Sequence, residues 1–313
     1  MSTLNAGLVI PRLTSPEVVA AIVEAESRGV VTAWSTVGGT SPDTVTTFAA
    51  AAISTSKIVL GTSITPTYPR HPITLASQVL ALEGLAPGRI RLGIGGSHRP
   101  TIEGGFGIPM GKPLDHLREY LTILRAILWE GTVDFTGEYL TAKISIPPGT
   151  TPPKTPLPIS ALRKNAFRLA GEIADGAISW VTPVQYLVNT ALPAIEAGAT
   201  LAGRLRPPII AHVPVAVSTE RDASRNAFRK QFPAYSKLPF YQGMFADAGF
   251  PVTSEETMTD ALVDNLAVSG SPDQIRKRLE SIRAEGIDEL LISQVVVREA
   301  ASELAILSEL LAG

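Results

Sequence analysis

The sequence predicts a (β/α)8 TIM barrel of the α/β class, with insertions at the C-terminal face. Short apolar runs rich in β-branched residues alternate with longer segments of helical period, which is typical of repeated βα units around a parallel sheet. Eight such runs can be counted, and 313 residues suffice for one barrel of ordinary size. We therefore expect a single barrel domain over residues 1–313.

Each apolar run is a candidate strand because it is short and bounded by Gly, Pro or charged residues. The expected strands are residues 4–10, 30–34, 57–64, 89–95, 157–161, 176–181, 209–217 and 289–295. The clearest helices between them are expected at residues 72–85 and 113–129.

The first helix carries recognisable end signals. Ser15 can accept backbone N–H groups as the cap, Pro16 fits the first helical position, and Glu17 suits the positive end of the helix dipole. Gly29 is expected to end this helix, since glycine readily adopts the left-handed conformation that follows a helix.

Two intervals are too long for simple connections. Residues 129–156 are expected to hold a small hairpin, with strands at 132–135 and 138–142. Residues 221–264 form the second probable insertion and carry Phe228, Phe232, Tyr235, Phe240, Tyr241, Phe245 and Phe250. Because insertions at the C-terminal face shape the mouth of a barrel, this segment is a candidate lid. The alternative is a helical insertion whose aromatic side chains pack on the barrel wall.

Composition excludes several classes of function. The 27 basic and 29 acidic residues give a net charge of −2, so no electrostatic footprint for nucleic acid is present. The chain has no cysteine, which excludes disulfides, thiolate catalysis and sulfur-ligated zinc. No apolar run is long enough for a membrane helix, and the N-terminus lacks the pattern of a secretory signal. We expect a cytoplasmic protein without a metal site.

The ends of the strands are where active sites of this fold lie. The residues there are Thr36 after the second strand; Thr62, Ser63 and Ile64 after the third; Gly95, Gly96, Ser97 and His98 after the fourth; Ser160, Ala161 and Leu162 after the fifth; and Trp180 after the sixth. Most are small or carry hydroxyl groups, and acid–base groups are scarce. Such a site suits a cofactor that carries the chemistry itself.

A basic segment follows the fifth strand. Arg163, Lys164 and Asn165 stand where a helix begins, so N–H groups and the positive end of the dipole add to two formal charges. An anion such as a phosphate is expected to bind there. The alternative is a solvated basic helix start.

Four blocks of the sequence resemble the luciferase-like monooxygenase family, and most closely its branch that uses the 5-deazaflavin coenzyme F420. They are LGTSITPTYPRHP at 60–72, RIRLGIGGSH at 89–98, LREYL at 117–121 and RLAGEIADG at 168–176. The blocks have the family's order and spacing over most of the chain. The resemblance is weakest in residues 221–264.

The resemblance implies roles for several residues. Ser63 and Ile64 would form a non-prolyl cis peptide, a backbone bulge under the deazaflavin ring. Gly96, Ser97 and His98 would line the cofactor, and Arg163, Lys164 and Asn165 would approach its phosphate. The chain departs from the family at that loop, because relatives often have a Gly-Pro pair where Arg163 and Lys164 stand.

The four histidines differ in their expected roles. His98 is the candidate for proton transfer, with Thr36 acting through a water as a second candidate; the alternative is that His98 only forms a hydrogen bond to cofactor or loop backbone. His71 is expected to be structural and His116 to face solvent. His212 lies within a strand and could point into the barrel. Trp180 is expected either to line the cofactor site or to pack in the core.

The leading hypothesis is an F420-dependent oxidoreductase that transfers a hydride between the deazaflavin and a small, apolar organic substrate. One alternative is a two-component monooxygenase that uses FMN, and another is a non-catalytic flavin-binding protein. The expected partners are a small-molecule substrate, a second copy of the chain in a homodimer, and an enzyme that supplies reduced cofactor. No partnership with nucleic acid or membrane is expected.

Overall fold

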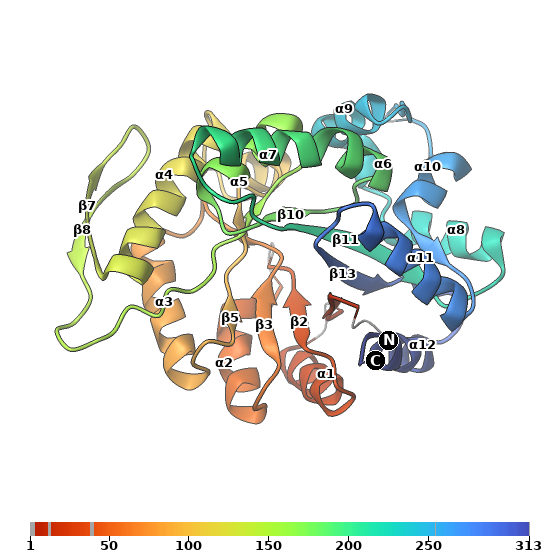
Figure 1. Cartoon of the computed structure of the whole chain (residues 1–313), viewed down its shortest axis with the longest axis horizontal. Helices are drawn as coiled ribbons and strands as arrows, with labels where there is room; N and C mark the ends of the chain where they lie inside the picture. Colours follow the sequence, from red (N-terminus) through yellow and green to blue (C-terminus); the bar gives the residue numbers. More distant parts are fainter. Residues whose placement is uncertain (1–3, 12–13, 38–40, 254, 313) are drawn as a thin grey trace.

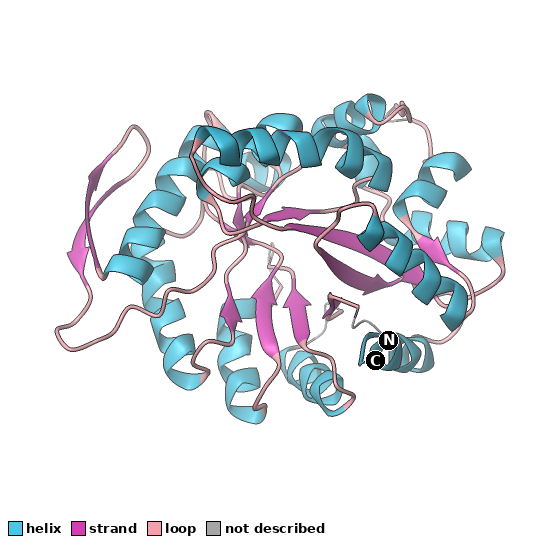
Figure 2. Cartoon of the chain, in the orientation of Figure 1, coloured by secondary structure: helices cyan, strands magenta, loops and turns pink. Residues whose placement is uncertain are grey.

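The computed structural model describes residues 4–11, 14–37, 41–253 and 255–312. A curled parallel sheet forms the interior, and helices lie around its outside (Figure 1, Figure 2). Its strands are β1 Ala6–Val9, β2 Thr32–Ser35, β3 Val59–Thr62, β4 Thr65–Pro66, β5 Ile90–Arg91, β6 Ile94–Gly95, β9 Ile159–Ser160, β10 Ala177–Ser179, β11 Ile209–Ala216 and β13 Glu289–Gln294. The short β12, Val268–Ser269, pairs with β11.

Two of the expected strands are each interrupted, one into β3 and β4 and the other into β5 and β6, and the sheet closes through both parts of each. β3 pairs with β5 while β4 pairs with β6, so the chain on either side of Ser63 and Ile64 bonds to the same neighbouring strand. β6 then pairs with β9, and the ladder continues through β10, β11, β13, β1 and β2 back to β3. If each interrupted strand is taken as one, the described residues form an eight-stranded barrel. The expected fold class is confirmed.

The helices follow the strands in alternation. They are α1 Ser15–Ser27, α2 Thr44–Ser54, α3 Pro72–Leu85, α4 Pro113–Arg125, α5 Lys164–Ile173, α6 Val184–Tyr186, α7 Leu192–Leu201, α8 Arg221–Gln231, α9 Pro239–Asp247, α10 Asp260–Leu266, α11 Pro272–Ala284 and α12 Ala300–Ala312. The π-helical segments are η1 Pro100–Gly105, η2 Ala126–Glu130 and η3 Leu187–Ala191, and η4 Tyr235–Lys237 is a single 3-10 turn.

The start of α1 differs by one residue from the expected start. The cap is Thr14 rather than Ser15, and Ser15 is the first helical residue. The backbone N–H of Thr14 donates to the Glu17 carboxylate at 2.9 Å, so the acidic side chain reaches back to the cap. Gly29 follows the helix with φ of +87°, which confirms its expected role.

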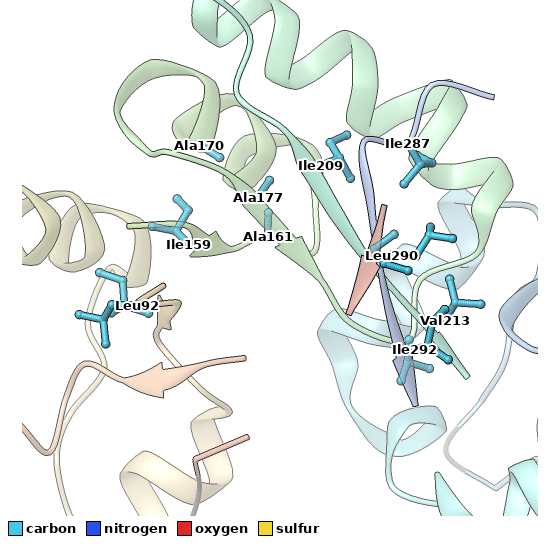
Figure 3. Packing of buried hydrophobic residues seen from close by; sticks show 14 of the residues in the cluster. Leu92, Ile159, Ala161, Ala170, Ala177, Ile209, Val213, Ile287, Leu290 and Ile292 are labelled. Atoms are coloured by element: carbon cyan, nitrogen blue, oxygen red, sulfur yellow. The ribbon is translucent and has the colours of Figure 1, made fainter. Parts of the chain in front are cut away.

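One tryptophan fills the middle of the barrel. Trp34 is fully buried and packs with Val9, Ile178, Ile210 and Leu291 from the surrounding strands. Two glycines make room for it: a Cβ at Gly7 would lie 2.7 Å from the indole ring, and one at Gly61 would lie 2.4 Å from it. Side chains on the other side of the strands, such as Leu92, Ile159 and Ile209, belong to the larger apolar core that includes the helices (Figure 3).

An ion pair lies beside this tryptophan. The Arg91 guanidinium stacks over the indole at 4.7 Å from the ring centroid and binds the Glu289 carboxylate at 2.7 Å. Glu289 is buried, and the Arg91 guanidinium gives its carboxylate the partner that a buried carboxylate requires.

The segment 129–156 contains the expected hairpin. Its strands are β7 Thr132–Thr136 and β8 Thr141–Ser145, so the second strand begins three residues later than expected. The hairpin stands away from the barrel, at the left edge of Figure 1. Glu119 of α4 accepts the backbone N–H groups of Glu138, Tyr139 and Leu140 and thereby holds its turn.

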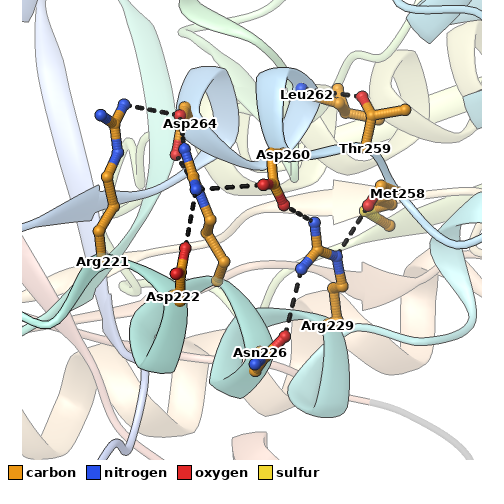
Figure 4. Close-up of polar contacts among 10 residues, drawn as sticks. Arg221, Asp222, Asn226, Arg229, Met258, Thr259, Asp260, Leu262 and Asp264 are labelled. Atoms are coloured by element: carbon orange, nitrogen blue, oxygen red, sulfur yellow. Dashed lines mark hydrogen bonds and ion pairs between the residues drawn. The ribbon is translucent and has the colours of Figure 1, made fainter.

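The segment 221–264 contains α8, η4, α9 and the first part of α10. Arginines of α8 bind aspartates of α10: Arg221 and Arg225 pair with Asp264, and Arg229 pairs with Asp260 (Figure 4). This network joins the two ends of the segment, and leaves η4 and α9 between them.

We predict that Gly61→Ala destabilises the protein by about 2–3 kcal/mol, because the new methyl group overlaps the Trp34 ring and the packed lumen cannot expand. Gly84→Ala is the matched control: nothing lies within 4 Å of its Cβ position on exposed α3 surface. That change is expected to stabilise the helix by about 0.5–1 kcal/mol. Urea unfolding measures both, and equal midpoints for the two variants would contradict the packing argument.

Candidate functional site

Residues from three strands meet at the C-terminal end of the barrel. A Cβ at Gly95 would lie 2.1 Å from the Ser160 hydroxyl oxygen and 3.2 Å from Ile64. Gly95 therefore has to be glycine for β4, β6 and β9 to approach one another. The structure brings together Ile64, Gly95 and Ser160, which were predicted independently from three strand ends.

The backbone between β3 and β4 has an unusual form. The Ser63–Ile64 peptide bond is cis, as the family resemblance implied. The Ser63 N–H donates to the Ser35 carbonyl at 2.9 Å, and the neighbouring Thr62 hydroxyl donates to the Gly93 carbonyl at 2.7 Å. The Ile64 side chain packs on the lumen cluster around Trp34. Ile64 thus forms part of the floor of the barrel mouth.

The Ser63 hydroxyl is buried, and it has no hydrogen-bond partner among the described residues. A buried polar group without a partner costs free energy, so a bound molecule or water is expected to satisfy it. This is the first indication that the mouth is shaped for a polar ligand.

His98 lies at the end of the glycine loop after β6. Ser97 before it has φ of +59°, which turns the chain, and the His98 carbonyl accepts N–H groups at the start of η1. The imidazole faces the rings of Tyr235 and Tyr241, with centroids 6.3 and 6.0 Å away. Burial lowers the pKa of His98, so the ring is neutral at pH 7.

Trp180 packs on the core, which is one of the two roles considered for it, and its role beside a cofactor stays a prediction. One face of its indole stacks on His212, with the ring centroids 3.6 Å apart and the planes within 5°. Its N–H donates to the Tyr235 hydroxyl at 2.8 Å. Trp180 therefore packs on the barrel interior and also contacts the segment 221–264.

His212 points into the barrel and is fully buried. Its Nδ1 accepts the Val181 N–H at 3.3 Å, and its Nε2 lies 2.7 Å from the Ser293 hydroxyl. Because Nδ1 is an acceptor, the proton is on Nε2. Burial lowers the pKa of His212 to about 3, so the ring stays neutral and fixes the plane of Trp180.

Most aromatic residues of 221–264 pack on the barrel, which is one of the two roles considered for them, and the lid role stays a prediction. Phe228, Tyr241 and Phe245 are buried in the apolar core, and the rings of Tyr235 and Tyr241 also face His98. Phe240 is 59% exposed. The segment is thus packed on the barrel and also supplies two rings to the mouth.

The basic segment begins α5 as expected, but Arg163 already has a partner. Its guanidinium binds the Asp247 carboxylate of α9 at 2.7 Å, and both side chains are nearly half exposed. A Cβ at Gly243 would lie 2.5 Å from the same guanidinium, so Arg163 lies directly on α9. Lys164 and Asn165 form the exposed first turn of α5. The two residues of this ion pair are 84 positions apart in the sequence, so no local pattern predicts it.

Thr36 lies in a small cavity at the end of β2. The cavity has a volume of about 30 Å³ and is lined by Ser35 and Thr36 together with residues of α1 and α2. It is large enough for one water molecule, which the buried Ser35 hydroxyl could bind. The Thr36 carbonyl accepts the Thr44 hydroxyl at 2.9 Å.

The expected position of His116 is wrong. We expected it to face solvent, but it is buried and stacks on Tyr68 with the ring centroids 4.0 Å apart. Its neighbours Asp115 and Arg118 suggested a polar helix face. The better signal was the spacing to Tyr120 and Leu124, which places His116 on the apolar stripe of α4. His71 caps α3 by accepting the Ile73 N–H, which confirms its structural role.

A broad groove on the outside of the barrel is lined by none of the residues predicted for the site. It has a volume of about 730 Å³ and runs between α4, η2, the β7–β8 hairpin and the end of α5. Within the described ranges, no cluster of three or more metal-binding side chains occurs, and no helix is long and apolar enough to cross a membrane.

Comparison with known sequences identifies a family. The family described as luciferase-like monooxygenase matches residues 6–289. An uncharacterised protein of Mycobacterium tuberculosis is 34% identical over 214 residues, which is 64% of this chain and 63% of that relative, so the chain spans less than two thirds of that relative's length. The 5,10-methylenetetrahydromethanopterin reductase of Archaeoglobus fulgidus is 28% identical over 265 residues, covering 77% of this chain and 78% of the reductase.

Solved structures show the same fold. An F420-dependent secondary alcohol dehydrogenase in complex with an F420-acetone adduct has a TM-score of 0.82 at 18% identity, covering 99% of this chain and 98% of that one. The oxygenating constituent of 3,6-diketocamphane monooxygenase from Pseudomonas putida, in complex with FMN, has a TM-score of 0.76 at 19% identity, with the same coverage of both chains.

We predict that the buried His116 makes stability depend on pH. Burial lowers its pKa to about 4, below the ordinary 6.5, so its contribution is complete above pH 6.5 and is lost as pH falls toward 4. In His116→Gln the loss of unfolding free energy between pH 7 and pH 4.5 is expected to be smaller by about 2 kcal/mol. Urea unfolding at both pH values measures this, and an unchanged difference would assign the titration to another group.

Proposed function

Because the chain belongs to the luciferase-like monooxygenase family, we propose that it is an F420-dependent oxidoreductase that transfers a hydride between the deazaflavin and a small, apolar organic substrate. The observation that supports this most is the composition of the mouth. Glycines, hydroxyls and the cis bulge at Ser63–Ile64 meet there, and His98 is the titratable group that faces Tyr235 and Tyr241. Such a site can position reactants, and it leaves the redox chemistry to a cofactor.

The residues at the mouth fit a deazaflavin. Ile64 would support the ring from below, Gly95 lets Ser160 approach Ile64, and Gly96 would leave room beside the ring. The buried Ser63 hydroxyl would gain the hydrogen-bond partner that it lacks among the described residues. Thr62, Ser97, Ala161, Leu162 and Trp180 would complete the surroundings of the ring, as predicted from the sequence.

The cofactor phosphate would bind at the start of α5. Lys164 and Asn165 contribute the first turn of the helix, where backbone N–H groups favour an anion. Arg163 would contribute charge only in competition with Asp247. Since an exposed ion pair is worth about 0–1 kcal/mol, a phosphate can displace the carboxylate.

The deazaflavin supplies hydride transfer when it is bound; the protein orients the reactants, excludes water and moves at most one proton. His98 is neutral at pH 7, so one imidazole nitrogen can accept a proton from a substrate hydroxyl during oxidation. In the reverse direction its N–H can donate to a carbonyl oxygen. Thr36, through a water in its cavity, is the second candidate for this role.

A second candidate is an FMN-dependent monooxygenase supplied by a reductase, because FMN also carries a phosphate and the Pseudomonas putida structure with FMN shares the fold. A protein that binds a flavin without turnover is the third. Homodimerisation and a separate enzyme that reduces the cofactor stay predictions.

The cofactor proposal predicts binding of F420 at micromolar concentration, measured as quenching of the F420 fluorescence during titration. FMN is titrated side by side under the same conditions. Tighter binding of FMN would favour the monooxygenase, and no binding of F420 at micromolar concentration would reject the proposal.

We predict that Asp247→Asn tightens F420 binding about threefold to tenfold, because Arg163 is released and one negative charge near the phosphate is removed. Asp134→Asn is the matched control, since Asp134 forms an exposed ion pair with Lys143 on the distant hairpin. If both variants bind F420 with the wild-type dissociation constant, Arg163 does not take part in binding the phosphate.

For His98 we predict that His98→Gln lowers kcat by about 10²-fold or more, while the dissociation constant for F420 changes little. Turnover is measured on a panel of secondary alcohols, enones and imines. Should kcat be retained and F420 binding weaken instead, His98 is a cofactor contact without a role in proton transfer.

A further inference from the structure

Trp180 connects the barrel interior to the segment above the mouth. One face of the indole lies on His212, inside the barrel, and its edge reaches Tyr235 of η4. The two contacts use different parts of the same side chain. A tryptophan that only packs in the core would need the stacking on His212 alone. The contact with Tyr235 is a directed hydrogen bond of 2.8 Å to another segment.

The plane of Trp180 is fixed from below. His212 is held on both ring nitrogens, by the Val181 N–H and by the Ser293 hydroxyl, so its ring cannot rotate without breaking a buried hydrogen bond. Val181 has φ of +47°, a conformation that β-branched residues rarely adopt, and its N–H is the one that reaches His212. The indole stacked on this ring therefore presents its N–H in one direction.

The hydrogen bond acts on a part of the chain that has little regular structure of its own. Tyr235 belongs to a turn of three residues between α8 and α9. Its ring packs on Phe232 and, at 4.8 Å, on Tyr241 of α9. Tyr235 and Tyr241 together face His98. Fixing Tyr235 thus fixes both rings that cover the histidine.

We propose that Trp180 is a positioning residue that docks residues 232–247, the aromatic lid, over the barrel mouth through its hydrogen bond to Tyr235. The docked lid keeps Tyr235 and Tyr241 against His98 and shields part of its imidazole from water. The Arg163–Asp247 ion pair anchors the other end of the aromatic lid at α5. The docking itself stands without the proposed function; only its benefit to His98 rests on it.

The test is hydrogen–deuterium exchange of the cofactor-free protein, followed by mass spectrometry of peptides from residues 232–247. Trp180→Phe keeps a ring on His212 and removes the N–H, and Tyr235→Phe keeps the packing and removes the acceptor. Each is expected to speed exchange in the aromatic lid about threefold to tenfold, and the double variant no further, because all three lack the same hydrogen bond. Phe240→Leu, at an exposed position of α9, is the control and should leave exchange unchanged.

A second readout separates docking from simple core packing. In Tyr235→Phe, acrylamide should quench tryptophan fluorescence more strongly than in the wild type, and this increase should vanish in the double variant that lacks Trp180. Wild-type exchange in both single variants, or additive effects in the double variant, would overturn the docking role. If Trp180→Phe fails to fold, the exchange and quenching of Tyr235→Phe decide alone.

The outcome is independent of the cofactor. Failure of F420 to bind, with the exchange pattern as expected, would reject the proposed function and leave the docking role intact. Binding of F420 with unchanged exchange in the variants would reject the docking role and leave the proposed function intact.

Discussion

The packing of Trp34 inside the barrel is the constraint on which the rest of the structure depends. The interior of a parallel barrel of this size has to be filled by side chains, which are usually several aliphatic residues. Here the indole of Trp34 occupies the middle of that space. Gly7 and Gly61 carry no side chain because the ring occupies that space. Arg91, held by Glu289, covers the same ring. With the middle filled in this way, the layer toward the strand ends is free for polar residues and for a ligand.

That upper layer is polar and yet carries little charge. His212 is neutral because burial prevents its protonation, and the neutral ring can stack on Trp180 without bringing a charge into the core. The order of contacts then runs from Ser293 through His212 and Trp180 to Tyr235, and from there to His98. The candidate site is therefore built from the barrel and the aromatic lid together.

Local sequence patterns predicted the helices and strands of the barrel well. The bounds of α3 agree with the expected 72–85, because His71 and Pro72 mark its start and the strand before it is strongly apolar. The strand ends were predictable too, since parallel strands place their carboxyl ends at one edge. The cis peptide came from family resemblance, because no rule of composition indicates it. His116 was misplaced because its charged neighbours obscured the apolar stripe of α4. The partners of Arg163 and Trp180 come from α9 and η4, far along the chain, and only the folded structure brings them together.

The charges around the mouth argue for the kind of reactant that it can hold. Arg70 is paired with Asp43, Arg99 with Glu103 and Arg163 with Asp247, so these guanidinium groups are already partly neutralised. His98 and Tyr241 are uncharged at pH 7, since burial lowers the pKa of the first and raises that of the second. An anionic group entering this aromatic surface would lose hydration without gaining a full counter-charge. A neutral substrate would lose little, and an aromatic wall favours it by burying apolar area. These charges support the proposed placement of a cofactor phosphate at α5, and the proposed use of an uncharged reactant beside His98.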